Sequence, residues 1–270
     1  MRLGFIGAGN MGTAIINGFI QSNKVLPSNI NVIRKNKEAL AQMTKDIGIN
    51  GYENYNELIA NSDILFLAIK PNLFSTIINE IKPYTANKDI TIVSIAAGLT
   101  IDNIISMFGY DCPVIRIMPN INAEVSMSAT AICNNTLVNQ SVLASVISLF
   151  DSIGNTYAID ESQFSIFTAI AGCSPAYVYL FIDSLAKGAL KMGMNKKQAL
   201  DIATTAIIGS CKMFQQSNAH PGDLIDRVCS PGGTTIAGLT TLDEYKFTAA
   251  VVKAVENSIL KDKEINNKDF

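Results

Sequence analysis

The glycines of the segment GAGNMG, residues 7–12, are spaced as Gly-x-Gly-x-x-Gly, which is typical of loops that bind the pyrophosphate of a dinucleotide. An apolar segment typical of a strand precedes the loop, and an amphipathic segment typical of a helix follows it. In that setting Gly7 permits the tight turn, Gly9 lets a phosphate approach the backbone, and Gly12 allows close packing of the helix. The free N–H groups of that helix attract the phosphates. The segment predicts a dinucleotide site, with a ligand-free glycine turn as the alternative.

The residues that follow the next expected strand bear on which dinucleotide is bound. An NAD site usually has Asp or Glu about 20 residues beyond the loop to hold the ribose hydroxyls. There is no acidic residue between Gly12 and Glu38. The strand is followed instead by Arg34, Lys35 and Asn36, whose donors suit a 2′-phosphate. This favours NADP(H) over NAD(H), the alternative being that these residues form a solvated loop.

The segment SPGGTT, residues 230–235, is a second candidate site in a region that otherwise reads as helical. Ser-Pro begins a helical turn, and two glycines leave backbone N–H groups unshielded by any Cβ. The hydroxyls of Thr234 and Thr235 stand beside them. Such a nest at a helix start can bind a carboxylate without Arg or Lys. A plain loop between two helices, with Thr234 as an N-cap, explains the same residues.

The elements that must position these two segments change type near residue 160. Strands are expected at 2–7, 30–33, 64–69, 90–96, 114–118 and 128–133, with helical patterns in most gaps. Continuous apolar strands separated by helices indicate a mainly parallel sheet covered on both faces. Residues 1–160 are therefore expected to form an α/β, Rossmann-type dinucleotide-binding domain.

Residues 161–270 read as an all-α domain. Helices are expected at 174–193, 196–217 and 242–263. Their start signals are Ser174 before Pro175, Asn195, and a capping box of Thr241 and Glu244. The segment 176–193 is apolar on nearly all sides, which is more helix surface than one small core covers. Burial in a subunit interface explains this, and so does a central position within the subunit.

Composition and charge exclude several classes of protein. A formal net charge of -2 without a dense Lys/Arg block argues against nucleic-acid or anionic-membrane binding. The longest apolar runs, 64–69 and 176–182, are shorter than the ~20 residues of a membrane span, and glycines interrupt any export signal at the start. Five cysteines without Cys-x-x-Cys and a single histidine indicate neither a disulfide framework nor a metal site. A soluble cytoplasmic protein with a small-molecule partner is expected.

A nicotinamide bound to the first domain implies hydride transfer, and the substrate is expected to meet it in the cleft between the two domains. The segment SPGGTT is the best candidate for holding that substrate.

Five segments carry a resemblance to a known family. They are FIGAGNMG (5–12), LAIKP (67–71), IRIMPN (115–120), SPAYVYLFIDSLAKGALKMG (174–193) and HPGDLIDRVCSPGGTTIAGL (220–239). In order and spacing they resemble pyrroline-5-carboxylate reductase over nearly the whole chain. The last segment is the most specific of the five.

The resemblance implies reduction of L-1-pyrroline-5-carboxylate to L-proline, the last step of proline biosynthesis, with NADPH as cofactor and NADH possible. It implies a Rossmann domain and a helical domain that interlocks with a partner in a homodimer, often assembled further into rings. No nucleic acid, membrane or metal is implied.

The site residues follow from the resemblance. Cofactor contacts are implied for Gly7, Ala8, Gly9, Asn10, Met11 and Gly12 at the pyrophosphate, Arg34 and Lys35 at the adenosine ribose, and Ala68, Ile69, Lys70, Pro71, Ala96, Ala97 and Gly98 on the nicotinamide side. Substrate contacts are implied for Asn120, Ser230, Gly232, Gly233, Thr234 and Thr235. Backbone N–H groups of 233–235 bind the carboxylate, and the Thr235 hydroxyl meets the ring nitrogen as the catalytic group.

This assignment suits the chemistry of an imine. Hydride attacks the C=N carbon readily when the nitrogen is protonated, and the substrate can bring that proton from solvent, so no strong general acid is obligatory. Catalysis comes mainly from orientation and proximity. Lys70 is expected to act by position more than by proton transfer, and His220 as a turn or cap residue more than as a base.

The sequence departs from the family pattern at four places. Ile121 and Asn122 stand where the family has Thr-Pro, Cys173 stands in a small-residue run before Ser174, Cys229 precedes SPGG, and Tyr55 replaces an Asn. The two thiols predict sensitivity to alkylation. The Tyr55 and Ile121 changes put one cofactor contact and the rigidity of one loop in doubt.

Two other readings use the same plan of domains. A β-hydroxyacid dehydrogenase resembles it but has a Lys after Gly-x-Gly in the interdomain helix, whereas Cys, Ser, Pro, Ala, Tyr and Val follow Gly172 here. A related imino-acid reductase, or a diverged NADP-binding sensor, is the other alternative. The intact SPGGTT argues against a sensor, which has no need of a carboxylate nest.

Overall fold

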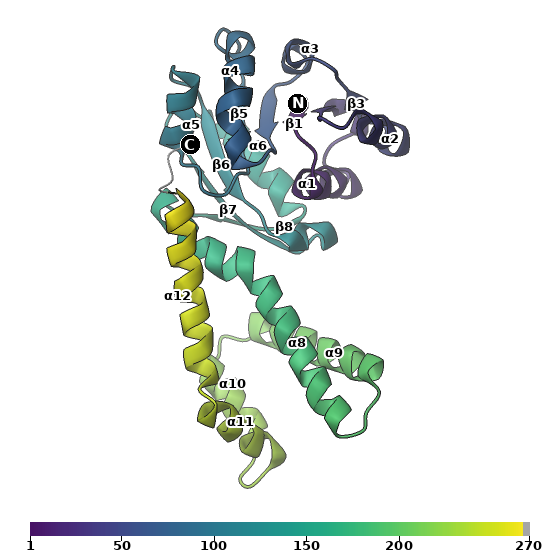
Figure 1. Cartoon of the computed structure of the whole chain (residues 1–270), viewed down its shortest axis with the longest axis vertical. Coiled ribbons are helices and arrows are strands. Elements are labelled where there is room, and N and C mark those ends of the chain that lie inside the picture. Colours follow the sequence, from purple (N-terminus) through teal and green to yellow (C-terminus); the bar gives the residue numbers. More distant parts are fainter. Residues whose placement is uncertain (267–270) are drawn as a thin grey trace. The chain divides into compact units, whose positions relative to one another are not determined.

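The computed structural model describes residues 1–266, which form two compact units (Figure 1). The first unit comprises Met1–Gly172 together with the chain from Ser258 onwards, and the second comprises Cys173–Asn257.

One sheet of eight strands, in the order β3-β2-β1-β4-β5-β6-β7-β8, forms the centre of the first unit. The strands are β1 (Leu3–Ile6), β2 (Ile30–Ile33), β3 (Asn50–Gly51), β4 (Ile64–Leu67), β5 (Thr91–Ser94), β6 (Val114–Met118), β7 (Ser128–Asn134) and β8 (Gly154–Ala158). Neighbouring strands are parallel except β6 and β7, which pair antiparallel. The mainly parallel sheet expected from the sequence is confirmed.

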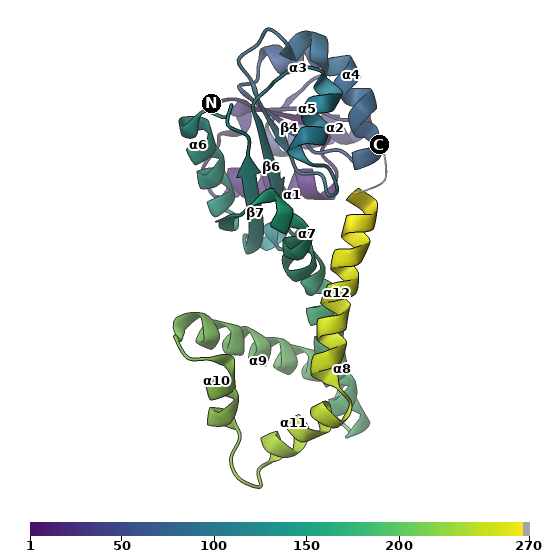
Figure 2. The same cartoon turned by 90° about the vertical axis from the view of Figure 1, so that its left-hand side faces the viewer.

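Helices cover both faces of this sheet (Figures 1 and 2). They are α1 (Asn10–Gln21), α2 (Lys37–Ile47), α3 (Tyr55–Ala60), α4 (Phe74–Thr85), α5 (Ile101–Phe108), α6 (Gln140–Asp151) and α7 (Phe164–Phe167). Short 3-10 turns lie at Pro27–Asn29, Pro71–Leu73, Ile121–Val125 and Glu161–Gln163. Apolar side chains of α1, α2 and α6 pack on one face, and those of α3, α4 and α5 pack on the other.

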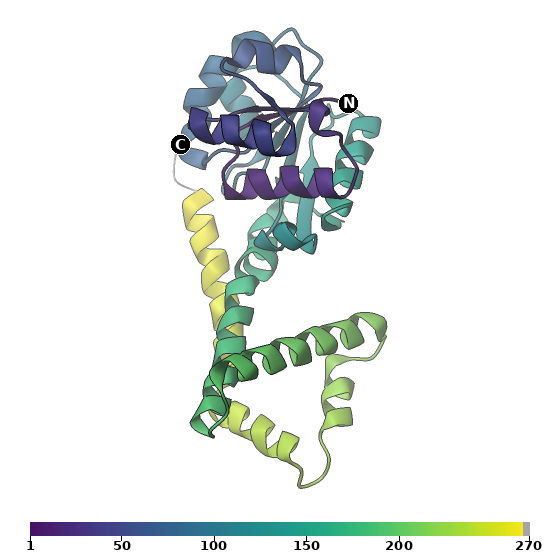
Figure 3. The same ribbon diagram turned by 90° about the vertical axis from the view of Figure 1, so that its right-hand side faces the viewer.

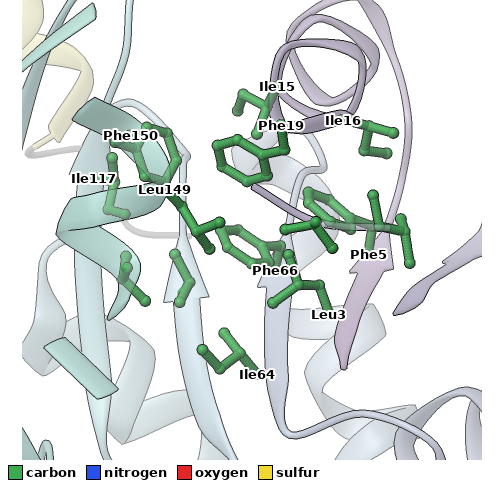
Figure 4. Packing of buried hydrophobic residues seen from close by; sticks show 14 of the residues in the cluster. Leu3, Phe5, Ile15, Ile16, Phe19, Ile64, Phe66, Ile117, Leu149 and Phe150 are labelled. Carbon is green, nitrogen blue, oxygen red and sulfur yellow. The ribbon is translucent and has the colours of Figure 1, made fainter. Parts of the chain in front are cut away.

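Aromatic rings hold the first of these faces together (Figure 4). The rings of Phe5 and Phe66, on neighbouring strands, stack with centroids 4.5 Å apart. Phe19 of α1 meets Phe150 of α6 edge to face at 5.3 Å. All four side chains are fully buried, and burial of each such side chain stabilises the fold by about 1.5–3 kcal/mol. The carboxyl edge of the sheet is thus mounted on a rigid core.

All six expected strands are present, and two further strands were missed. β3 has only two residues, and β8 has the sequence GNTYA, in which no residue is buried. Strand prediction from apolar runs fails at both, because each lies at an end of the sheet and needs no apolar face on both sides.

The second unit contains helices only, as expected. They are α8 (Ser174–Lys191), α9 (Lys196–Gln216), α10 (Pro221–Val228), α11 (Thr234–Glu244) and α12 (Phe247–Asn266), the last of which continues into the first unit. The Asn195 side chain caps α9 as predicted, accepting from Lys197 N at 2.9 Å.

Two predicted helix starts are wrong. Ser174 does not begin a helix, because α8 continues a π-helical turn, Thr168–Cys173, and helical structure runs from Glu161 to Lys191. Thr241 lies inside α11, and the last helix begins at Phe247, after Lys246 adopts a φ of 55°. A positive φ at a lysine ends one helix and redirects the chain, which a capping-box pattern does not reveal.

Helix α8 is largely exposed in the described chain. The side chains of Tyr179 and Leu180 are 59% and 66% exposed. Within the second unit α8 packs on α9, while α10 and α11 spread apart instead of closing into a bundle (Figure 3). A central, buried position for this helix within its own subunit is therefore wrong. Large exposed apolar surfaces of this kind mark interaction sites.

Candidate active site

The predicted cofactor segments follow the carboxyl ends of four parallel strands. Residues 7–12 follow β1, Arg34 follows β2, Ala68–Pro71 follow β4, and Ala96–Gly98 come shortly after β5. β1 lies between β2 and β4, so the chain crosses to opposite sides of β1 at this point. A switch point of this kind, outside the carboxyl ends of the strands, is where open α/β sheets bind ligands.

Gly7 lies between the ends of β2 and β4. Its N–H donates to Ile33 O at 2.8 Å, and its φ is 90°. A Cβ on Gly7 would lie 2.5 Å from Ala68 O, which excludes every other residue type. The tight turn at Gly7 is therefore required by its neighbours as well as by its backbone angle.

The start of α1 has the properties of an anion site. Gly9 is the N-cap and makes no side-chain cap, and no acidic residue stands in the first turn. Nothing lies within 4 Å of the place of a Gly9 Cβ, whereas a Gly12 Cβ would lie 3.2 Å from the Ala68 Cβ. The loop is open where a phosphate would approach and closely packed where the helix meets β4. This fits a pyrophosphate at uncapped N–H groups.

A cavity of about 540 Å³ extends from this loop along α1. Its lining residues are Ala8, Gly9, Asn10, Thr13, Ala14, Asn17, Gly18, Gln21, Arg34 and Glu124. Prediction from the sequence missed Thr13, Asn17 and Gln21. Their spacing from Asn10, which places them on one side of α1, is the signal that could have found them. Thr13 Oγ1 donates to Ala8 O at 3.2 Å and ties the loop to the helix.

The cations after β2 differ in whether they are paired. Arg34 is half-buried and lines the cavity, and Lys35 is exposed. Within residues 1–266 neither makes an ion pair, whereas Lys37 Nζ lies 2.9 Å from Glu53 Oε2. Asn36 caps α2 by accepting from Ala39 N at 2.9 Å. Arg34 and Lys35 are thus the cations free to meet an anionic ligand.

The nicotinamide-side segments are turns with exposed edges. Ala68 and Ile69 are half-buried, and Lys70 is exposed at the start of the turn Pro71–Leu73. Ala96 is buried and Ala97 is exposed, and Gly98 has a φ of 81°. The two segments present backbone and small side chains, which leaves room for a flat ring.

Asn120 is buried, and its two polar ends are in different states. Its side-chain Nδ2 donates to Ala171 O at 2.9 Å, and its backbone N donates to Ser128 Oγ at 3.2 Å. Its Oδ1 has no hydrogen-bond partner in the part of the chain that the structure describes. The predicted substrate residue is thus held by one end and has a free acceptor at the other.

The SPGGTT segment forms an uncapped helix start in the second unit. Helix α11 begins at Thr234 with Gly233 as its N-cap, and no side chain caps it. Gly233 N donates to Ser230 O at 3.0 Å, and Gly232 has a φ of 69°. The alternative in which Thr234 is the N-cap is therefore wrong. The hydroxyls of Thr234 and Thr235 are exposed beside free N–H groups, as in a carboxylate nest.

His220 is a capping residue, as expected. It is the N-cap of α10, where its Nδ1 accepts from Gly222 N at 3.1 Å and its N–H donates to Asp223 Oδ2 at 3.1 Å. An imidazole held in a capping box has an ordinary structural role. No group of residues suited to a metal ion is found within residues 1–266.

The sites of family departure divide by burial. Cys173 and Cys229 are half-buried, and Cys211 is exposed. Burial raises the pKa of Cys112 to about 11 and of Cys133 to about 12. Tyr55 begins α3 and packs against the buried cluster of the second face, and burial raises the pKa of its phenol.

The sequence also left unnoticed a buried ion pair. Arg116 stands in the middle of β6, and its NH1 lies 2.9 Å from Glu161 Oε1. An arginine inside the otherwise apolar run VIRIM is the signal that could have found it, because a buried charge needs a partner.

Comparisons with known proteins agree on one family. Residues 161–265 match the model for pyrroline-5-carboxylate reductase dimerisation, and residues 2–98 match that for NADP oxidoreductase, coenzyme F420-dependent. Pyrroline-5-carboxylate reductase of Escherichia coli K12 is 39% identical over 265 residues, with 98% of each chain covered. Pyrroline-5-carboxylate reductase 2 of Bacillus subtilis is 36% identical, covering 98% of this chain and 95% of that one.

Solved structures give the same result. The Plasmodium falciparum pyrroline carboxylate reductase with NADP bound is 33% identical with a TM-score of 0.90, over 99% of this chain and 98% of that one. The Streptococcus pyogenes 1-pyrroline-5-carboxylate reductase is 39% identical with a TM-score of 0.87, over 98% of both chains. Prephenate dehydrogenase of Aquifex aeolicus, at 11% identity and a TM-score of 0.53, shares the fold alone.

Proposed function

The chain belongs to the pyrroline-5-carboxylate reductase family and reduces L-1-pyrroline-5-carboxylate to L-proline with NADPH, and on that premise we propose which residues hold each reactant. The observation that carries the substrate assignment is the uncapped start of α11 at Gly233 and Thr234. The reaction is the last step of proline biosynthesis, and NADH is a possible second cofactor.

The pyrophosphate is held by the loop Gly7, Ala8, Gly9, Asn10, Met11 and Gly12. Support comes from the open space at Gly9 and the uncapped first turn of α1. Arg34 and Lys35 bind the 2′-phosphate, because they are the cations after β2 that make no ion pair within residues 1–266. Charge-assisted hydrogen bonds from a guanidinium suit this group.

NADPH supplies the hydride. Ala68, Ile69, Lys70 and Pro71 on one segment, and Ala96, Ala97 and Gly98 on the other, line the nicotinamide side. Their backbone groups and small side chains orient the ring and limit the access of water. Lys70 contributes its position and its charge, and it is not needed as a proton donor.

The substrate carboxylate accepts hydrogen bonds from the N–H groups at Gly233, Thr234 and Thr235. Ser230 and Gly232 shape the turn that presents those groups. The Thr235 hydroxyl meets the ring nitrogen, which arrives protonated from solvent. Asn120 offers its free Oδ1 to a donor of the bound substrate. Rate enhancement then comes mainly from holding the two reactants in the reacting geometry, which can supply about 7–11 kcal/mol.

The protein acts on a small molecule as an oligomer. We place the domain boundary at 160/161, with a Rossmann domain at 1–160 and a helical domain at 161–270, where the dimerisation match begins. The exposed apolar side chains of α8 and α9 pack against a second copy in a homodimer, and dimers assemble further into a ring. The segment Glu161–Lys191 is also long and apolar enough to cross a membrane by length and composition. Its match to the dimerisation model favours a protein interface and a soluble, cytoplasmic enzyme with reduced thiols.

One assay tests the activity. Purified protein is mixed with pyrroline-5-carboxylate and NADPH, and the loss of NADPH absorbance is followed, with NADH in a parallel sample. Turnover with NADPH is expected. No turnover with either cofactor would refute the enzyme assignment and leave a dinucleotide-binding sensor. Turnover with a β-hydroxyacid and not with the imine would favour the alcohol dehydrogenase reading.

A further inference from the structure

Arg116 carries a charge inside the sheet of the first unit. It lies in the middle of β6, and it is 2% exposed. Its NH1 donates to Glu161 Oε1 at 2.9 Å, and its Cζ lies 4.4 Å from the centre of the Phe164 ring. Its Nε has no partner within the described residues. A buried cation in this setting depends on its one carboxylate partner, because an unpaired buried charge is strongly unfavourable.

Glu161 joins three elements through one oxygen. Besides the Arg116 guanidinium, its Oε1 accepts from Ile101 N at 2.8 Å. Ile101 is the first residue of α5, and α5 follows the loop Ala96–Gly98 on the nicotinamide side. A carboxylate at this helix start is also favourable for the helix dipole. The pair therefore ties β6, the beginning of α5 and the chain at Glu161 together.

The chain at Glu161 opens the long helical segment that leads into the second unit. Helical structure runs from Glu161 to Lys191 without a break, and Cys173 begins the second unit. A second attachment lies further along it, where Asn120 Nδ2 donates to Ala171 O at 2.9 Å in the π-helical turn. Such turns are frequent at functional sites. We call the two contacts, Arg116–Glu161 and Asn120–Ala171, the helix anchor.

We propose that Arg116 and Glu161 are positioning residues for the reduction. They hold the start of the helical segment and the start of α5 on β6, and so they keep the nicotinamide-side loop and the connection to the carboxylate nest in fixed geometry. They touch neither reactant. The proposal rests on the reactant sites given under the proposed function. Displacement by about 1 Å from a distant change can cost about a hundredfold in rate.

The first test is Glu161→Gln, which keeps the shape and removes the charge. The kcat for pyrroline-5-carboxylate is expected to fall about tenfold or more, while the Kd of NADPH, measured by fluorescence titration, stays unchanged. The matched control is Asp160→Asn, a neighbouring exposed carboxylate that makes no ion pair within residues 1–266. This control is expected to keep the kcat of the unaltered protein.

The second test separates positioning from stability. The double variant Arg116→Met with Glu161→Gln removes both charges, and replacing a buried pair by uncharged groups is often neutral or stabilising. The double variant is expected to regain the Tm of the unaltered protein and to keep the low kcat. If kcat returns together with Tm, or if Glu161→Gln retains full kcat, the proposal is overturned. Failure of both variants to fold overturns it as well, because the pair is then a folding determinant.

These outcomes are distinct from failure of the proposed function. Lack of turnover by the unaltered protein is seen before any variant is compared. The anchor is judged only against an active reference.

Discussion

The place of a Cβ on Gly7 lies 2.5 Å from the carbonyl oxygen of Ala68, so the loop after β1 touches the end of β4 with no room for a side chain. The same residue has a φ of 90°. Gly9, two residues later, has nothing within 4 Å of its Cβ position and a φ of -74°. Two glycines of one loop therefore serve different purposes, and substitution separates them.

Gly7→Ala is expected to lower the free energy of unfolding by ~2 kcal/mol or more, because the new Cβ clashes with backbone and the left-handed angle is strained. Thermal unfolding measures this loss. Gly109→Ala is the matched control, since Gly109 has a φ of 73° and open space around its Cβ. The control is expected to cost only about 1 kcal/mol. Equal losses in the two variants would contradict the steric argument.

Gly9→Ala is expected to leave stability unchanged and to weaken NADPH binding. The added methyl group meets no protein atom, but it lies where the phosphate approaches the backbone. Fluorescence titration with NADPH, read beside the Tm, checks this. Unaltered NADPH affinity would show that the pyrophosphate lies elsewhere.

Arg34→Ala is expected to raise the KM for NADPH about tenfold to a hundredfold, as for loss of a hydrogen bond to a charged group, with little change in the KM for NADH. The half-buried Arg34 lines the cavity at the start of α1. Lys37→Ala is the control, because Lys37 is already paired with Glu53 at 2.9 Å. Equal effects on NADPH and NADH would argue against a 2′-phosphate contact.

Thr235→Ala is expected to lower kcat about tenfold or more and to leave NADPH binding unchanged, because the hydroxyl meets the ring nitrogen and not the cofactor. Thr235→Ser should restore most of the rate. Thr240→Ala, in the same helix, removes a hydroxyl that bonds Ile236 O at 3.1 Å and serves as the control. A full rate for Thr235→Ala would refute the role of the hydroxyl.

Alkylation of the native protein at pH 8 is expected to reach Cys211, Cys173 and Cys229 and to spare Cys112 and Cys133. Burial raises the pKa of Cys112 to about 11, so about one thiol in a thousand is thiolate at pH 8, and the thiolate is the reactive form. Mass spectrometry after timed labelling identifies the sites. Activity should fall as Cys173 and Cys229 react, and full activity after complete modification of both would contradict their place near the substrate.

The same pKa direction predicts how these two thiols affect stability. A folded pKa above the unfolded value means that the neutral thiols of Cys112 and Cys133 favour the folded state below about pH 9. That contribution is lost as pH rises through about 11 to 12. Cys112→Ala should flatten the fall of Tm with pH in this range, whereas Cys211→Ala, at an exposed position, should not.

Local patterns in the sequence determined the fold class and the two reactant segments. The spacing of Gly7, Gly9 and Gly12 between an apolar run and an amphipathic run identifies a dinucleotide loop, because turn, phosphate approach and helix packing each need glycine within a few residues. The β-branched runs located all six of the longer apolar strands. The segment 230–235 indicated a nest, because Gly and Thr at a helix start are informative without any distant contact.

Tertiary structure alone decided three further points. Gly233, and not Thr234, caps α11, which depends on backbone angles that composition does not give. Helix α8 is exposed in its own chain, which its apolar sequence allowed but did not specify. Arg116 and Glu161, 45 residues apart, meet at 2.9 Å. Such contacts depend on how the strands are ordered in the sheet, and the sequence period reports only which face of its own element a residue occupies.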